Sequence, residues 1–217
     1  MKTLVTFGDS WPQGGELNWP DVPYGNLLQE MLDYDKFYNY GSAGASNEDL
    51  VLQLLEHLEQ HDNKFTAIFF LTNPARSMHW PRGMSWSWMS EERKHWPGDA
   101  LDTIKELFLH FHDDNRDMIR ASMSVTTCQR ICQHYGIDDY YFAGWVQYKH
   151  WLPGVNTTKI FMQGQETAAD WFGATDHNGE HLLDVQDNKY IKPNFAHPNQ
   201  LGHQLIAEKL KEWITTN

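Results

Sequence analysis

The sequence has few basic residues and no long hydrophobic run, and each shortage excludes a class of protein. Lysine and arginine together number 17 against 29 aspartates and glutamates, which gives a formal net charge of −12. Nucleic-acid binding depends on a basic face, and no basic cluster interrupts this acidic excess, so we expect no nucleic-acid partner. No apolar run approaches the length that spans a bilayer, so we expect no membrane insertion.

The chain also lacks the sequence features of exported and modular proteins. Residues 1–10 carry no long apolar stretch of the kind found in signal peptides, so we expect a soluble, cytoplasmic protein. There is no internal repeat, low-complexity tract or linker, and 217 residues suffice for one substantial core. We therefore expect a single domain over residues 1–217, whose oligomeric state the sequence leaves open.

Potential metal and disulfide ligands are scarce. The only cysteines, Cys128 and Cys132, lie in a stretch with helical character, where neighbouring thiols rarely have disulfide geometry. No partners for a zinc site lie nearby, so we interpret both as reduced thiols in the core. His57 and His61 have a zinc-like spacing on one helix face, but no third ligand is evident. We interpret that face as solvated.

The sequence does contain an alternation of short apolar strands and amphipathic helices. The expected strands cover residues 2–8, 36–40, 66–71 and 140–146. The expected helices cover residues 24–32, 46–61, 99–135 and 199–213. A break near Asp113 within the third of these stays open. This order predicts an α/β fold, a three-layer sandwich with a central parallel sheet and helices on both faces. Its site would lie at the carboxyl ends of the strands.

Polar or glycine-rich turns follow three of these strands. Ser10 ends the run Gly8-Asp9-Ser10, where a strand would expose a serine hydroxyl as a nucleophile, although these are also ordinary turn residues. We interpret Asp9 as structural, because aspartate readily binds neighbouring backbone N–H groups. Gly44 and Asn73 follow the second and third strands. Each has an alternative role, Gly44 as a turn glycine and Asn73 as a cap.

Near the C-terminus, His197 opens the run His197-Pro198-Asn199 before the last helix. A neutral imidazole suits general base chemistry at neutral pH. The same three residues also make a good helix start, so a purely structural role stays open.

Taken in chain order, these four segments resemble the motifs of the SGNH hydrolase superfamily, also called GDSL esterases and lipases. The resemblance spans the chain from end to end and implies a flavodoxin-like fold. It implies Ser10 as nucleophile and His197 as base. The Gly44 N–H and the Asn73 side-chain amide would join the Ser10 N–H in an oxyanion hole. It implies no metal or organic cofactor.

The sequence departs from the family pattern at three positions. Asn194 stands where the family has the aspartate that orients the histidine, so it can accept a hydrogen bond but adds no charge. Asp184, Asp187 or a backbone carbonyl are candidate replacements. Leu71 stands in place of a glycine, and Pro74 follows the asparagine.

We therefore expect a serine esterase acting on a small-molecule or carbohydrate ester. Residues 74–98 form an insertion rich in Trp and Met, which favours O-acetyl esters of carbohydrate if it lines a cleft. It could instead be a packing flap or an oligomer contact. Two other functions stay open. One is a weak or inactive binding module for a glycan or acyl group, which Asn194 favours. The other is a structural assembly component.

Overall fold

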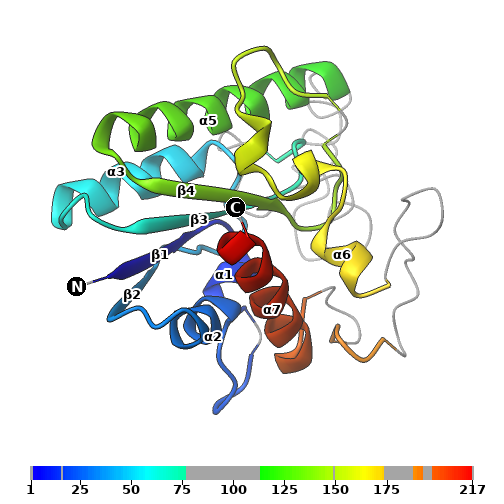
Figure 1. Ribbon diagram of the computed structural model, residues 1–217. Coiled ribbons are helices and arrows are strands. Elements are labelled where there is room, and N and C mark those ends of the chain that lie inside the picture. Colours follow the sequence, from blue (N-terminus) through cyan, green and yellow to red (C-terminus); the bar gives the residue numbers. More distant parts are fainter. Residues whose placement is uncertain are drawn as a thin grey trace, which may run out of the picture.

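The structure is a computed structural model, and it describes residues 2–15, 17–76, 113–148, 150–173, 188–192 and 197–216. Helices and strands alternate along these residues, as the sequence predicts (Figure 1). In order they are β1 Thr3–Phe7, α1 Ser10–Gln13, α2 Tyr24–Met31, β2 Lys36–Asn39, α3 Asp49–Gln60, β3 Thr66–Leu71, α5 Asp114–Tyr135, β4 Asp138–Ala143, η2 Thr157–Lys159, η3 Phe161–Gly164, α6 Ala168–Trp171 and α7 Gln200–Thr216.

The four strands form one parallel sheet in the order β2-β1-β3-β4. The chain runs from β1 outward to β2 and then crosses back to β3 on the other side of β1. The strand order therefore reverses between β1 and β3, and the carboxyl ends at such a switch point are where α/β folds place their ligands. Ser10 and Asn73 follow the two strands that flank this point.

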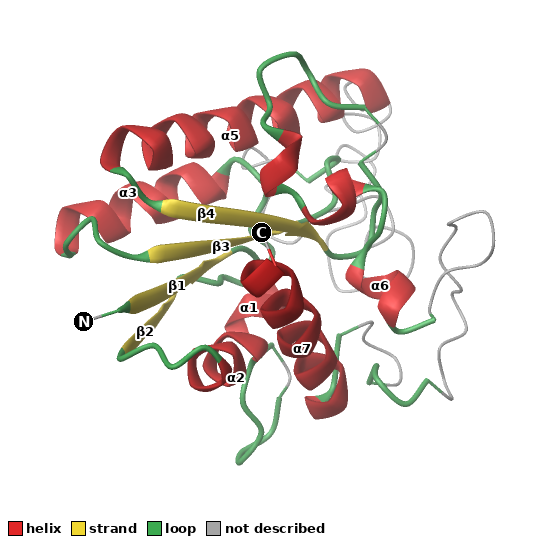
Figure 2. Cartoon of the chain, in the orientation of Figure 1, coloured by secondary structure: helices red, strands yellow, loops and turns green. Residues whose placement is uncertain are grey.

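Helices cover both faces of the sheet, which confirms the predicted three-layer sandwich (Figure 2). Successive strand residues point to opposite faces, and both faces are buried. The face covered by α3 and α5 contains Val5, Phe7, Ala67, Phe69, Leu71 and Tyr141. The face covered by α2 and α7 contains Leu4, Ile68, Phe70 and Phe142. The sheet is thus held rigidly beneath the loops at its carboxyl edge.

Several element boundaries differ from the prediction. β4 covers Asp138–Ala143 rather than residues 140–146. It begins earlier because two aspartates pair with β3 despite their charge, and it ends earlier because the chain turns at Gly144. A Cβ atom at Gly144 would lie 2.2 Å from the ring of Phe70. Residues 11–13, which lie between the predicted strand 2–8 and the predicted helix 24–32, belong to the helical turn α1.

Side-chain hydrogen bonds mark the starts of α5 and α3. Asp113 accepts a hydrogen bond from the Arg116 N–H at 2.9 Å and begins α5 at the predicted break. Before α3, Oδ2 of Asp49 accepts a hydrogen bond from the Ser46 N–H at 2.7 Å, and Oγ of Ser46 accepts one from the Asp49 N–H at 3.4 Å. This reciprocal pair has the pattern of a capping box. No described helix, α5 included, is long and apolar enough to cross a membrane.

Cys128 and Cys132 are free, fully buried thiols on α5, as predicted. Burial raises the pKa of both. They are therefore neutral packing residues.

His57 contradicts the prediction of a solvated helix face. Its ring is fully buried against Phe7 and Phe65, because His57 lies on the same face of α3 as the core residues Leu50 and Leu54. Burial, and to a lesser extent His61, lower its pKa to about 4. Within the described ranges, no group of three or more His, Cys, Asp or Glu residues could hold a metal ion.

Candidate active site

The position of the expected nucleophile lies in a sharp turn directly after β1. Gly8 adopts a φ angle of 145°, and a Cβ atom there would lie 2.8 Å from the Cβ of Phe70, so only glycine fits. Asp9 then caps α1, because its Oδ1 accepts a hydrogen bond from the Trp11 N–H at 3.0 Å. Ser10 is the first residue of α1. Gly8 and Asp9 therefore hold the turn in one backbone conformation, which fixes the position of the Ser10 hydroxyl.

Ser10 and His197 lie within hydrogen-bonding distance although 187 residues separate them in the chain. The Oγ atom of Ser10 is 2.8 Å from Nε2 of His197. An imidazole nitrogen at this distance can take the hydroxyl proton as a general base, which makes the serine oxygen a nucleophile. The structure thus brings together two predicted site residues from opposite ends of the sequence.

The backbone at His197 is held by the segment 188–192. The N–H of Lys192 donates to the His197 carbonyl at 2.8 Å, and the N–H of Asn199 donates to the Tyr190 carbonyl at 2.9 Å. The run also begins the last helix, because Oδ1 of Asn199 accepts a hydrogen bond from the Gly202 N–H at 3.1 Å, so the structural alternative is correct for the backbone. It leaves the imidazole of His197 available to Ser10.

Gln53 of α3 forms hydrogen bonds with the backbone of the nucleophile turn. Its Oε1 accepts a hydrogen bond from the Gly8 N–H at 2.8 Å, and its Nε2 donates to the Gly8 carbonyl at 2.9 Å. One buried amide thus satisfies both backbone polar groups of Gly8. The sequence analysis missed Gln53. The available signal was a polar residue on the inward face of the helix, next to Leu50 and Leu54.

The loop that carries Gly44 is attached to the nucleophile turn at two points. The N–H of Ser42 donates to the Gly8 carbonyl at 3.0 Å, and Nδ2 of Asn39 donates to the Pro12 carbonyl at 2.6 Å. Gly44 itself adopts a φ angle of 76°, in the left-handed region that favours glycine. Its interpretation as a turn glycine is therefore correct for the backbone conformation, and the same loop lies against the turn that carries the nucleophile.

Asn73 opens the loop after β3 and uses its two side-chain polar atoms differently. Its Oδ1 accepts a hydrogen bond from the Ala75 N–H at 2.9 Å, so the predicted alternative role as a cap is correct for this atom. This bond fixes the plane of the amide. Within the described residues Nδ2 makes no hydrogen bond, and Nδ2 is the donor that an oxyanion would need. The cap and the donor role therefore do not compete.

Asn47 ties the loop after β2 to the end of β3. Its Oδ1 accepts from the Thr72 N–H at 3.1 Å, and its Nδ2 donates to the Thr72 carbonyl at 3.2 Å. The Tyr148 hydroxyl accepts from the same Nδ2 at 2.9 Å and donates to the Thr72 carbonyl. Burial raises the pKa of Tyr148, which keeps its hydroxyl protonated as a donor. The sequence analysis missed both Asn47 and Tyr148.

Asp9 completes this set of cross-links, because it joins the nucleophile turn to the loop after β3. The residue is only 3% exposed. Its Oδ2 accepts hydrogen bonds from Oγ1 of Thr72 at 2.8 Å and from Nη1 of Arg76 at 2.6 Å. The predicted structural role is confirmed, whereas the ion pair with Arg76 was not predicted.

A second histidine, His203, lies fully buried on α7. Its Nδ1 accepts a hydrogen bond from the Tyr24 N–H at 3.2 Å, which joins α7 to the start of α2. Burial lowers the pKa of His203 to about 3, with smaller contributions from His197 and Lys192. The ring is therefore neutral at pH 7 and serves as a hydrogen-bond acceptor in the core.

Part of the predicted site lies outside the described residues. Asn194 is one such position, and the candidate replacement acids Asp184 and Asp187 are two more. Of the Trp-rich insertion over residues 74–98, only residues 74–76 are described.

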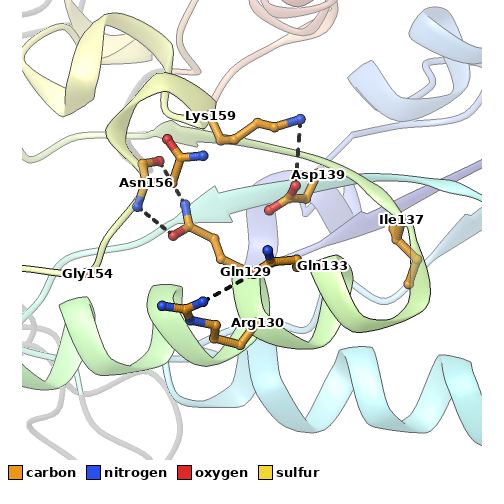
Figure 3. Close-up of a pocket in the computed structure, with 8 residues that line it drawn as sticks. All are labelled: Gln129, Arg130, Gln133, Ile137, Asp139, Gly154, Asn156 and Lys159. Atoms are coloured by element: carbon orange, nitrogen blue, oxygen red, sulfur yellow. Dashed lines mark hydrogen bonds and ion pairs between the residues drawn. The ribbon is translucent and has the colours of Figure 1, made fainter.

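A cavity of about 410 Å³ lies apart from these residues, between α5, the start of β4 and the segment around η2 (Figure 3). Within it, the amide of Gln129 exchanges hydrogen bonds of 2.9 Å and 2.8 Å with the Asn156 backbone. Nζ of Lys159 lies 3.8 Å from Oδ1 of Asp139. Because Asp139 is near the amino end of β4, this cavity opens at the opposite end of the strands from the predicted site.

No family model matches the chain, and no curated protein is similar to it in sequence. Similar solved structures exist. The psychrotrophic esterase EstA from Pseudoalteromonas sp. is 14% identical, and the alignment covers 99% of this chain and 97% of that chain with a TM-score of 0.51. A protein of the G-D-S-L family from Desulfitobacterium hafniense DCB-2 is 13% identical, with 97% and 98% covered and a TM-score of 0.50. Together with the parallel sheet, these likenesses show that the chain shares the α/β fold of these two proteins.

Proposed function

We propose that the chain is a serine hydrolase that cleaves ester bonds through an acyl-serine intermediate. The observation that carries this proposal is the distance of 2.8 Å between Ser10 Oγ and His197 Nε2 at the switch point of the sheet. A serine hydroxyl is a weak nucleophile until a base takes its proton, and a base in direct contact meets that need. The fold shared with an esterase supports the same reaction class.

In the proposed reaction, Ser10 Oγ attacks the ester carbonyl carbon while His197 takes the hydroxyl proton. The carbonyl oxygen becomes an oxyanion, for which the backbone N–H groups of Ser10 and Gly44 and Nδ2 of Asn73 are the proposed donors. Collapse of this intermediate breaks the ester bond, and the proton on His197 passes to the departing alcohol. Water then gives a proton to His197 and attacks the acyl-serine, which releases the acid and restores the serine.

We further infer that the substrates are small-molecule or carbohydrate esters, with O-acetyl groups of carbohydrate as the favoured class. This inference rests on the Trp content of residues 74–98, because tryptophan rings pack well against sugars. We take that segment as an insertion in a single domain over residues 1–217. The competing function is a binding module without turnover, which Asn194 favours because it supplies no charge to the imidazole.

The direct test is covalent labelling with a fluorophosphonate, followed by mass spectrometry to locate the modified residue. We expect the parent chain to be labelled at Ser10 and to hydrolyse p-nitrophenyl acetate, and Ser10→Ala to do neither. Ser124→Ala is a matched control, because Ser124 is a buried serine on α5. A folded parent chain that is never labelled and never hydrolyses the ester would overturn the hydrolase and favour the binding module.

A further inference from the structure

A carboxylate and a guanidinium lie in direct contact beside Ser10, largely shielded from solvent. Oδ2 of Asp9 is 2.6 Å from Nη1 of Arg76, and the two side chains are 4% and 16% exposed. Asp9 directly precedes Ser10 in the nucleophile turn. Arg76 belongs to the loop after β3 that also carries Asn73. This ion pair therefore joins the two loops that hold the proposed nucleophile and one proposed oxyanion donor.

Both oxygens of Asp9 are occupied, so the carboxylate has a single position. Oδ1 accepts from the Trp11 N–H at 3.0 Å, and Oδ2 accepts from Thr72 at 2.8 Å as well as from Arg76. The Nε atom of Arg76 is buried and has no hydrogen-bond partner in the part of the chain that the structure describes. A buried ion pair with an unsatisfied N–H is a poor source of stability, since apolar residues of similar size often do as well. A role other than stability is therefore expected for it.

The charge on Asp9 would oppose the proposed reaction if nothing compensated it. Attack on an ester builds negative charge on the carbonyl oxygen next to Ser10, and a buried carboxylate one residue away repels that charge strongly in a medium of low dielectric constant. On the pKa of Tyr148, the charges of Asp9 and Arg76 act in opposite directions. Burial raises the pKa of Tyr148 and its bond with Asn47 lowers it, while Asp9 and Arg76 add smaller effects of opposite sign.

We propose that Arg76 is a positioning residue of the nucleophile. It neutralises the carboxylate of Asp9, and it fastens the turn of Ser10 to the loop of Asn73 so that nucleophile and donor keep one geometry. The inference rests on the proposed hydrolase function for its catalytic consequence, whereas its electrostatic part can be measured without any turnover.

The electrostatic part is tested in the variant Ser10→Cys, whose thiol is titrated through the ultraviolet absorbance of the thiolate. Residue 10 contacts His197 directly, and it follows Asp9, which pairs with Arg76, in the chain. The native cysteines do not interfere, because burial raises the pKa of both. Adding Arg76→Met should raise the pKa of the new thiol by about one unit, because Asp9 then lacks its counter-charge.

Further variants in the Ser10→Cys background separate charge from structure. Adding Asp9→Asn to Arg76→Met should return the thiol pKa to the starting value, and Arg76→Lys should leave it nearly unchanged. Asp9→Asn alone should lower the thiol pKa. This variant keeps the test decisive even where Arg76→Met fails to fold. A thiol pKa that responds to neither Asp9→Asn nor Arg76→Met overturns the inference.

The catalytic part is tested with Ser10 in place, on p-nitrophenyl acetate. Arg76→Met should lower kcat by roughly 10²-fold with little change in KM, because the uncompensated carboxylate of Asp9 then opposes the oxyanion and the two loops lose a link between them. Asp9→Asn with Arg76→Met should recover part of this loss, which a purely structural role would not allow. The matched control is Arg120→Met, because Arg120 pairs with Asp117, whose side chain is also 4% exposed. That control should keep the parent kcat.

The outcomes separate this inference from the proposed function. Shifted thiol pKa values in a chain that never hydrolyses esters support the charge role of Arg76 and reject the hydrolase. An active parent whose kcat and thiol pKa are unaffected by Arg76→Met rejects the inference and leaves the hydrolase in place.

Discussion

The side-chain amide of Gln53 pairs with both backbone polar atoms of Gly8, at 2.8 Å and 2.9 Å, immediately before the nucleophile turn. The amide of Gln129 makes the same pair of bonds with the backbone of Asn156, at 2.9 Å and 2.8 Å, in a part of the molecule without an assigned role. The chain therefore contains an internal control for the effect of such a clamp on the site.

Gln53→Met should lower both stability and turnover. It leaves the buried N–H of Gly8 unsatisfied, at a cost of about 1–3 kcal/mol, whereas the Gly8 carbonyl keeps its hydrogen bond from the Ser42 N–H. It also frees the turn that positions Ser10. Gln129→Met removes the equivalent clamp and should lower stability without changing kcat. Urea unfolding and p-nitrophenyl acetate hydrolysis measure the two effects, and equal losses of kcat in both variants would argue against a special role for Gln53.

Ser10→Ala and His197→Ala should each abolish ester hydrolysis, and the double variant should be no worse than either single one. The two residues act as one unit through their hydrogen bond of 2.8 Å, so their effects are not additive. Initial rates of the three variants at saturating ester provide the comparison. Unchanged turnover in folded Ser10→Ala would remove Ser10 from the mechanism.

Asn73→Ala should lower kcat by roughly 10²-fold with little change in KM, as expected for the loss of one oxyanion donor. Asn73→Asp separates the two roles of the side chain. It retains the oxygen that accepts from the Ala75 N–H and loses the NH₂ group.

The matched control for this substitution is Asn156→Asp, because Asn156 caps Thr158 in the same way at 3.1 Å. If Asn73 is a donor, Asn73→Asp should be as slow as Asn73→Ala while Asn156→Asp keeps the parent kcat. A change in KM alone would assign Asn73 to substrate binding.

Stability should decrease as the pH falls from about 7 toward 4. Burial lowers the pKa of His57 to about 4 and that of His203 to about 3, against an ordinary value of 6.5. At pH 5 both rings are neutral in the folded chain and protonated in the unfolded chain, so unfolding takes up protons.

The variant His57→Gln with His203→Gln should therefore lose less stability between pH 8 and pH 5 than the parent does. Urea unfolding at the two pH values gives the difference. His134→Gln, at an exposed position on α5, should retain the parent's dependence. A double variant with the parent's full pH dependence would contradict the assignment.

Asn194→Asp should raise kcat/KM if the side chain at this position faces the imidazole of His197. An aspartate there would stabilise the imidazolium, whereas the reverse change costs about 10⁴-fold in the serine-protease example. Asp184→Asn and Asp187→Asn test the alternative on the same ester. If one of those acids already serves His197, its removal should slow the reaction and Asn194→Asp should bring no gain.

The sequence predicted the elements whose residues are locally distinctive. β3 matches to the residue, because Thr66–Leu71 is a continuous apolar run buried on both sides. β4 was misplaced because Asp138 and Asp139 have no strand character of their own and are held by pairing with β3. Leu201 on α7 is 53% exposed although it is apolar, because the buried stripe of the helix runs through Gly202, Ile206 and Leu210.

The site was predicted only where residue types mark strand ends or the start of the last helix, in order along the chain. That pattern led to Ser10, Gly44 and Asn73 after strands and to His197 before the helix. It could not lead to Gln53, Asn47 or Arg76, because their partners lie far away in the chain, at separations of 45, 25 and 67 residues. No spacing along a sequence encodes a bond between a side chain and a distant backbone atom.

The separation of 187 residues between Ser10 and His197 has a consequence for how the proposed activity arises. A ribosome makes the serine 187 residues before the histidine, so over that interval a nascent chain carries the hydroxyl without its base. A chain cut anywhere between the two positions yields fragments that each lack half of the pair. Ester hydrolysis would therefore report that synthesis has passed His197 and that the segment carrying His197 has docked, and it would return in a mixture of fragments only when they reassemble.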